Sequence, residues 1–206
     1  MTRAYIAVGS NLDPQRHIPS ALRRLAGHAR VRLTAISTFY LAPALDRPEQ
    51  PAFYNGAVEI ATDLPPRELK FSVLREIEAQ EGRRRSADRY AAREIDLDLV
   101  AYDDLQVTDS DLVLPDPEIA ARPFLAVPLA ELAPDLLLPS AWGGLSSPPS
   151  GPAAHPGEGG LESPPYADSP PSGRTLREAA AALDASALRP LPGFTARLRK
   201  ELLHES

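Results

Sequence analysis

The chain has 206 residues, a formal net charge of −6 and a pI of about 5.3, which allows one domain with its own core and argues against non-specific nucleic-acid binding. It has no cysteine, which excludes disulfides and thiolate chemistry, and its four histidines lack zinc-site spacing. No apolar stretch reaches transmembrane length. Because the first residues lead directly into an apolar segment with no signal peptide, we expect a cytoplasmic protein that binds neither membranes nor nucleic acid.

The N-terminal residues predict a strand followed by a helix. Residues 4–8 form an apolar run typical of a buried strand, and a Gly-Ser-Asn turn closes it. Ile18, Leu22 and Leu25 recur at the spacing of one helix face. Pro19 falls within this helix, so we expect it in the first turn or at a kink.

Two more strands and a second helix are predicted before residue 82. Alternating apolar side chains predict strands over residues 31–40 and 53–62. The proline-rich residues 41–51 between them predict a long loop, and loops of this length are often functional. A helix should start within residues 64–68, where proline lies near the first helical position, and should end at Gly82.

Residues 82–98 carry five arginines that precede Asp96 and Asp98. The two aspartates alternate with apolar residues over 95–100, a pattern that predicts a strand with both carboxylates on one face. Such a pair favours a hard cation such as Mg²⁺ between its oxygens, and arginine forks match phosphate oxygens. The stretch therefore indicates a metal–polyphosphate site; the alternative is a solvated strand face beside a loop that binds nothing.

Helical segments dominate the remaining residues. Short helices are predicted at residues 115–119 and 127–132, and longer ones at 175–183 and 193–204. Residues 141–173 are rich in Pro, Gly and Ser and offer little apolar surface to bury, so a flexible insertion is predicted there.

The order of the first six elements, βαββαβ, predicts an α+β, ferredoxin-like sandwich with helices on one face of the sheet and a C-terminal helical extension. We expect a core at residues 1–140, the flexible insertion at 141–173, and a helical segment at 174–206 that packs on the core.

The chain carries a specific combination of different short motifs, at residues 5–12, 37–40, 50–55, 77–78, 82–85, 89, 93–99 and 122–124. Taken together they resemble the 6-hydroxymethyl-7,8-dihydropterin pyrophosphokinase family over residues 4–139 and again from Gly173. The resemblance implies a ferredoxin-like fold. It also implies a folate-pathway reaction, in which pyrophosphate passes from ATP to the hydroxymethyl group of 6-hydroxymethyl-7,8-dihydropterin and AMP is released.

The resemblance also implies roles for individual residues. Asp96 and Asp98 would hold two Mg²⁺ ions on the triphosphate, and Arg83 and Arg93 would stabilise charge in the transition state. Contacts to ATP are implied for Arg83, Arg85, Arg89, Arg93, Leu99, Asp116 and Arg122. Contacts to the pterin are implied for Ala42, Pro43, Leu45, Phe53, Asn55 and Phe124. Asn11 and Glu78 are expected to brace the site.

Some positions depart from the family pattern. Asp116 stands where the family usually carries a histidine that contacts ATP, and an aspartate there must turn away, pair with an arginine or reach a metal. Two other functions therefore stay open: a different Mg-dependent nucleotidyl or phosphotransferase on the same fold, and an inactive nucleotide-binding module. We expect the chain to act as a monomer.

Overall fold

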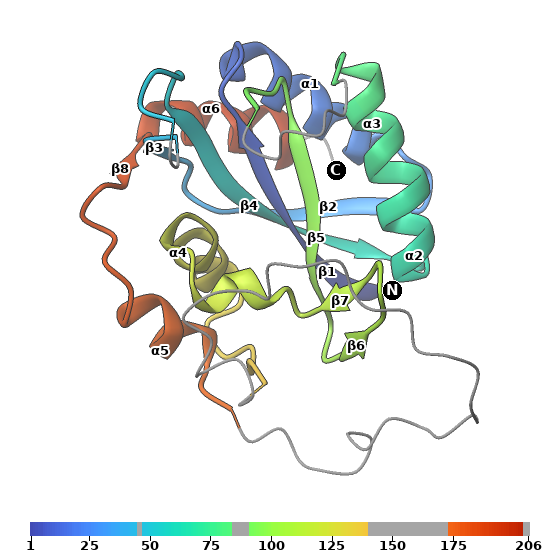
Figure 1. Cartoon of the computed structure of the whole chain (residues 1–206). Coiled ribbons are helices and arrows are strands. Elements are labelled where there is room, and N and C mark those ends of the chain that lie inside the picture. The colour runs from blue at the N-terminus through green and yellow to red at the C-terminus, as the bar shows by residue number, and fades with distance from the viewer. Residues whose placement is uncertain (45–46, 84–90, 140–172, 204–206) are drawn as a thin grey trace.

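The computed structural model describes residues 1–44, 47–83, 91–139 and 173–203 (Figure 1). Within these residues an antiparallel sheet of six strands has the order β5–β1–β4–β3–β8, and β2 also pairs with β4. The strands are β1 (Thr2–Ser10), β2 (Val31–Ile36), β3 (Tyr40–Ala42), β4 (Phe53–Thr62), β5 (Asp96–Tyr102) and β8 (Arg189–Pro190). The fold is therefore α+β, as the sequence predicts.

The centre of the sheet divides two apolar cores. Side chains alternate along β1, so that Ile6 and Val8 pack into one core while Tyr5 and Ala7 pack into the other. The first core is covered by α1 (Pro14–Ala26), α2 (Pro66–Glu68), the π-helical segment η1 (Leu69–Leu74), α3 (Arg75–Gln80) and α6 (Pro192–Leu203). These helices lie on one side of the sheet in Figure 1.

The second core lies under η2 (Pro117–Ala120), α4 (Pro123–Leu132) and α5 (Leu176–Ala181). The expectation of helices on one face only is therefore wrong. The physical reason is that both faces of the central strands are apolar. Tyr5, Ala7 and Ala57 are buried, as are the residues that alternate with them, and α4 covers them while α5 packs against α4 (Figure 1).

The strand predicted over residues 31–40 is interrupted. β2 ends at Ile36 and β3 begins at Tyr40, because the backbone at Phe39 bonds elsewhere: its N–H donates to Thr195 Oγ1 (2.9 Å) and its carbonyl accepts from the Leu191 N–H (2.8 Å). Since β3 continues to Ala42, the loop predicted over 41–51 begins two residues later than expected.

The second predicted helix is confirmed as the continuous run α2–η1–α3, and Gly82 follows it with a positive φ of 96°. Pro19 lies inside α1 beyond its first turn, so of the two expected positions the first turn is wrong and the kink stays a prediction. A small hairpin of β6 (Val107–Thr108) and β7 (Val113–Leu114) was not predicted. No helix among the described residues is long and apolar enough to cross a membrane.

Two backbone hydrogen bonds join the residues on either side of the predicted insertion. The Leu138 N–H donates to the Arg174 carbonyl (3.0 Å), and the Leu176 N–H donates to the Leu136 carbonyl (2.8 Å). Apart from its last residue, the predicted insertion at 141–173 lies outside the described residues, as does residue 204 of the helix predicted at 193–204.

Candidate functional site

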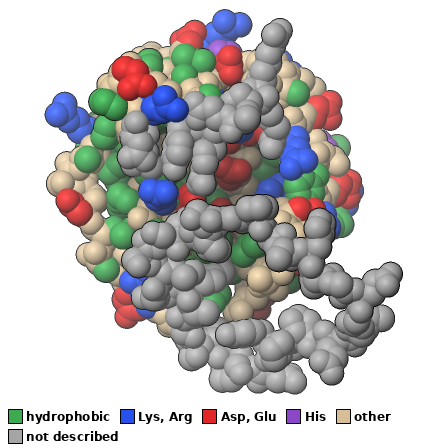
Figure 2. Space-filling model, viewed as in Figure 1, with side chains coloured by type: hydrophobic (Ala, Val, Ile, Leu, Met, Phe, Trp, Pro, Cys, Tyr) green, Lys and Arg blue, Asp and Glu red, His purple; other side chains and the backbone are tan. Residues whose placement is uncertain are grey.

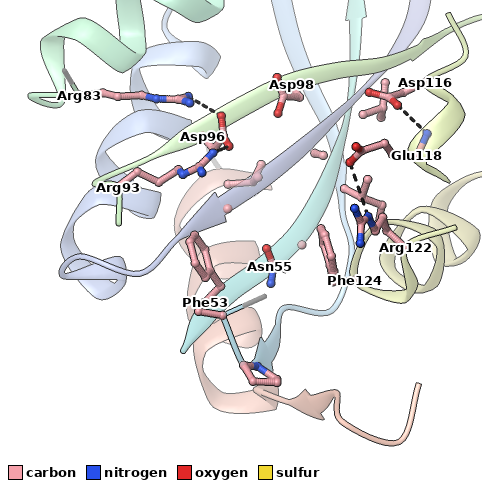
Figure 3. Close-up of a pocket in the computed structure, with 18 residues that line it drawn as sticks. Phe53, Asn55, Arg83, Arg93, Asp96, Asp98, Asp116, Glu118, Arg122 and Phe124 are labelled. Carbon is pink, nitrogen blue, oxygen red and sulfur yellow. Dashed lines mark hydrogen bonds and ion pairs between the residues drawn. The ribbon is translucent and has the colours of Figure 1, made fainter. Parts of the chain in front are cut away.

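A cavity of about 350 Å³ opens on the α4 side of the sheet, over β1, β4 and β5 (Figure 3). This volume lies in the usual range for small-molecule sites. Figure 2 shows acidic and basic side chains gathered around the hollow on this face. The lining residues are Ala7, Val8, Gly9, Pro43, Ala44, Phe53, Asn55, Gly56, Arg83, Arg93, Asp96, Asp98, Val100, Asp116, Glu118, Arg122, Phe124 and Leu125.

β5 supplies two carboxylates to the cavity. Asp96 and Asp98 both line it (Figure 3), while Leu97 and Leu99 between and after them are buried in the core on the opposite face. The alternation read from the sequence is thus present in the strand. It places two acids side by side with their shared face open to a ligand.

Two arginines converge on Asp96. Arg83 pairs with Oδ1 and Arg93 with Oδ2 (Figure 3). Arg83 also pairs with Glu78, whose carboxylate accepts a hydrogen bond from the Leu97 N–H (2.9 Å) and so ties the arginine to β5. Burial disfavours the charged guanidinium, but Asp96 and Glu78 outweigh it and raise the pKa of Arg83.

Asp98 is in a different electrostatic environment. The protein packed around its carboxyl disfavours the charged form, and the negative charges of Asp96, Glu78 and Asp116 add to that effect. Together they raise the pKa of Asp98 to about 7, although Arg83 opposes the shift. The two acids of β5 therefore differ, since Asp96 is paired with two arginines whereas Asp98 faces mainly other acids.

This donor set fits a hard divalent cation. Mg²⁺ takes oxygen ligands and is usually held by one or two carboxylates together with substrate phosphates and water, and the acids of β5 provide two such carboxylates. No group of three or more His, Cys, Asp or Glu side chains placed to hold a metal occurs in the part of the chain that the structure describes. Substrate oxygens or water would have to complete the coordination.

The other end of the cavity is shaped for a flat ring. Phe53 at the start of β4 and Phe124 in the first turn of α4 stand on either side of Asn55 (Figure 3). Two aromatic faces favour stacking on a planar group, and a side-chain amide both donates and accepts hydrogen bonds along its edge. Arg93 lies near this end, with Cζ 5.9 Å from the centre of the Phe53 ring.

Asn11, in the turn after β1, connects the two ends. Its Oδ1 accepts from the Arg93 N–H (2.8 Å), and its Nδ2 donates to the Pro51 carbonyl (3.1 Å) just before Phe53. The Asn11 N–H in turn donates to the Arg93 carbonyl (3.2 Å). One side chain therefore fixes the backbone of an arginine that faces Asp96 and of the loop that leads to the aromatic slot.

Asp116 lines the cavity and caps a helix. Its Oδ1 accepts from the Glu118 N–H (2.8 Å) and caps η2 (Figure 3). Burial raises the pKa of Asp116, with the Glu118 hydrogen bond opposing. Glu118 itself lines the cavity, with Oε2 3.8 Å from Arg122 Nε. Sequence reasoning missed Glu118, although it is the next acid in the same Asp-Pro-Glu turn.

Of the remaining predicted site residues, only some line the cavity. Pro43 lines the cavity, whereas Ala42 is buried in β3 and is not part of the lining. The side chain of Leu99 is 2% exposed in the opposite core, so only its backbone faces the strand edge. Leu45, Arg85 and Arg89 lie outside the described residues.

The sequence of this chain is similar to those of known proteins of one family. A family model described as 7,8-dihydro-6-hydroxymethylpterin-pyrophosphokinase (HPPK) matches residues 5–134. The chain is 42% identical over 139 residues to a 2-amino-4-hydroxy-6-hydroxymethyldihydropteridine pyrophosphokinase of Methylorubrum extorquens, covering 67% of this chain and 87% of that protein. Proteins with the same name are 38% identical over 138 residues in Pseudomonas aeruginosa (66% and 84% covered) and 36% identical over 141 residues in Haemophilus influenzae (68% and 87% covered).

Proposed function

The chain belongs to the 7,8-dihydro-6-hydroxymethylpterin-pyrophosphokinase family, and from this premise we propose that it transfers pyrophosphate from ATP to 6-hydroxymethyl-7,8-dihydropterin in folate biosynthesis. The observation that carries the proposal is a cavity that joins an aromatic slot to a charged end, which includes Asp96, Asp98, Arg83 and Arg93. A planar acceptor and a polyphosphate donor have to meet in this reaction, and the cavity offers a matching surface to each.

The bonds that change define what the site has to do. The hydroxymethyl oxygen forms a bond to the β-phosphorus of ATP, the bond between that phosphorus and the oxygen bridging to the α-phosphorus breaks, and AMP leaves with that oxygen. The hydroxyl proton passes to solvent or to a nearby base. No protein nucleophile takes part, so the residues contribute by positioning and by electrostatic stabilisation.

We assign the aromatic slot to the pterin. Phe53 and Phe124 would stack on its two faces, a contact worth about 0.5–1.5 kcal/mol for each aromatic pair beyond burial. Asn55 would hydrogen-bond the amide-like edge of the ring. The backbone of the loop that follows Ala42, with Pro43 and Leu45, would close the same edge.

We assign the charged end to the triphosphate. Arg83 and Arg93 would exchange Asp96 for phosphate oxygens, because a guanidinium fork binds either anion in the same geometry. Asp96, released from that pairing, and Asp98 would together hold two Mg²⁺ ions. Bound there, the metal would supply positive charge to the β-phosphoryl group and to the attacking oxygen.

The other nucleotide contacts complete this assignment. Arg85, Arg89 and Arg122 would bind phosphate oxygens, and the backbone at Leu99 would face the nucleotide base. Asp116, whose side chain caps η2, would offer a hydrogen-bond acceptor at the rim of the cavity. It would not supply a positive charge to the nucleotide. We propose a monomer as the active unit.

We also propose the finer architecture that the sequence suggests. The order of the four long strands, β5–β1–β4–β2, and the helices that follow β1 and β4 support a ferredoxin-like core. Residues 1–140 would form that core, 141–173 an insertion, and 174–206 an extension docked on it.

Product analysis tests the proposed function. The protein is incubated with ATP, MgCl₂ and 6-hydroxymethyl-7,8-dihydropterin, and nucleotides are separated by ion-exchange chromatography. AMP should appear in equal amount with the pterin diphosphate, and only when pterin is present. ADP as the product, or AMP formed at the same rate without pterin, would contradict the proposal.

A further inference from the structure

We propose that the C-terminal segment, residues 189–203, is a positioning element for the pterin end of the cavity and acts through Phe39 on strand β4. The proposal rests on the proposed function, since it concerns the substrate that the aromatic slot takes. It adds residues that lie beyond the family match at 5–134 and that do not line the cavity.

The segment joins the core at the edge of the sheet next to the site. β8 extends the sheet by pairing with β3, with Leu41 opposite Arg189 and Tyr40 opposite Pro190. β3 leads directly into Pro43 at the cavity wall. α6 then crosses behind the sheet and packs against β2 and α1 (Figure 1).

The backbone N–H and carbonyl of Phe39 both form their hydrogen bonds with this segment. Its N–H donates to Thr195 Oγ1 (2.9 Å), and its carbonyl accepts from the Leu191 N–H (2.8 Å). The Thr195 hydroxyl in turn donates to the Leu191 carbonyl (3.0 Å). Thr195 is 2% exposed, so water cannot replace these bonds if the hydroxyl is removed.

The ring of Phe39 transmits this placement to β4. Phe194 packs edge-on against Phe39 (centroids 5.4 Å apart, 84° between planes) and against Tyr54 (5.3 Å, 83°). Phe39 lies so close to Gly56 that a Cβ added there would sit 2.8 Å from its ring atoms. Tyr54 and Gly56 are thus held from behind by the aromatic rings of the segment and of Phe39.

Asn55 lies between these two held positions. Because side chains alternate along a strand, Asn55 and Phe53 face the cavity while Tyr54 faces the core that α6 covers. A shift of Phe39 therefore moves the backbone that carries Phe53 and Asn55. Among the described residues the acids of β5 make no direct contact with the segment, since β1 lies between β5 and β4. The expected consequence is selective: pterin binding depends on the segment more strongly than nucleotide binding does.

Thr195→Val is the informative variant, because it keeps the shape of the side chain and removes the hydroxyl. Thr195→Ser restores the hydroxyl and serves as the conservative rescue. Phe194→Leu tests the ring contact independently. Leu202→Ala is the matched control: Leu202 is also buried in α6 (7% exposed), but it lies two turns, about 10 Å, along the helix from Thr195.

Two affinities are measured for each full-length variant. The first is the Kd of α,β-methylene-ATP with MgCl₂, and the second is the Kd of 6-hydroxymethylpterin in the presence of that saturating nucleotide. Thr195→Val and Phe194→Leu should raise the pterin Kd about fivefold or more and leave the nucleotide Kd within about twofold. Thr195→Ser should bind pterin within about twofold of wild type, and Leu202→Ala should lower Tm while also staying within about twofold.

The outcomes distinguish a failure of the positioning role from a failure of the proposed function. If wild type binds pterin and Thr195→Val leaves that Kd unchanged, or if Leu202→Ala raises it as much as Thr195→Val does, the positioning role is overturned while the proposed function stands. If pterin and nucleotide affinities fall together in every variant, the segment acts on stability alone and the positioning role is again overturned. A wild-type protein that binds the nucleotide but no pterin would overturn both.

Discussion

Arg83 ion-pairs with Asp96, so a residue proposed to bind phosphate neutralises a residue proposed to hold metal. Arg93 occupies the second oxygen of the same carboxylate. Without nucleotide, both oxygens of Asp96 are therefore paired within the site. Nucleotide and metal can enter together by exchanging partners, because the phosphates replace Asp96 on the arginines while the cations replace the arginines on Asp96.

This exchange predicts opposite effects on metal binding and on turnover when the arginine is removed. Arg83→Met should bind Mn²⁺ alone, followed by electron paramagnetic resonance, more tightly than wild type, because a competing cation has left Asp96. AMP formation in the same variant should fall by about 10²-fold or more, as when one group that stabilises a transition state is lost. Weaker Mn²⁺ binding than wild type would show that Arg83 does not compete for the acid.

Substitution of either acid should abolish most activity. Asp96→Asn and Asp98→Asn each remove one anionic oxygen from the proposed metal site, and kcat for AMP formation should drop by at least about 10²-fold. Asp111→Asn is the control, because Asp111 pairs with Arg67 at the surface and is not part of the cavity lining. Near-normal turnover in either cavity variant would falsify the metal assignment.

The aromatic slot should control pterin affinity. Phe124→Ala removes one stacking face and part of the buried surface, so the pterin Kd should rise about tenfold or more. The Kd of an ATP analogue should stay within about twofold, since the charged end of the cavity is unchanged. Fluorescence titration with 6-hydroxymethylpterin measures the first value and calorimetry the second. Equal loss of both affinities would assign Phe124 to general packing of α4 instead.

A buried carboxylate outside the cavity predicts how stability depends on pH. Glu81 follows α3 and accepts hydrogen bonds from Ser20 (2.6 Å) and Arg24 (2.8 Å) and pairs with His17 (3.0 Å) on α1. Burial favours its protonated form, but these three partners outweigh burial and lower the pKa of Glu81 below its usual value. The stabilisation is therefore present above the pKa of the unfolded chain and is lost as pH falls through the lower, folded value.

Glu81→Gln should accordingly be less stable than wild type at pH 7, by about 1–3 kcal/mol. The difference should start to shrink as pH falls below the unfolded value of about 4.3 and should vanish once pH has fallen through the lower, folded pKa. Urea unfolding at several pH values gives both free energies, and Glu76→Gln on the exposed side of α3 provides the comparison. A difference that stays constant down to acidic pH would mean that the charge of Glu81 contributes nothing.

Local patterns account for much of the site. The alternation in β5 sufficed to place Asp96 and Asp98 on one face, and Gly82 marked the end of a helix through its φ preference. These features depend on residues that are close in sequence, so they can be predicted without a structure. The roles assigned to the site residues stay predictions.

Other features depend on residues far apart in the chain. The break between β2 and β3 arises because Thr195 and Leu191, more than 150 positions later, take over the hydrogen bonds of Phe39; nothing near Phe39 signals it. The second layer of helices was missed for the same reason. Periodicity identifies an apolar face but not the segment that covers it.

The paired backbone at Leu138 and Arg174 has a consequence for how this chain tolerates change. Leu138 and Arg174 lie at neighbouring points of the folded body, so the residues between them need not span any fixed distance. The entropy of closing such a loop grows only slowly with its length. Drift in the size and composition of this segment would therefore cost the enzyme little, and the same position suits the insertion of a reporter or an affinity tag.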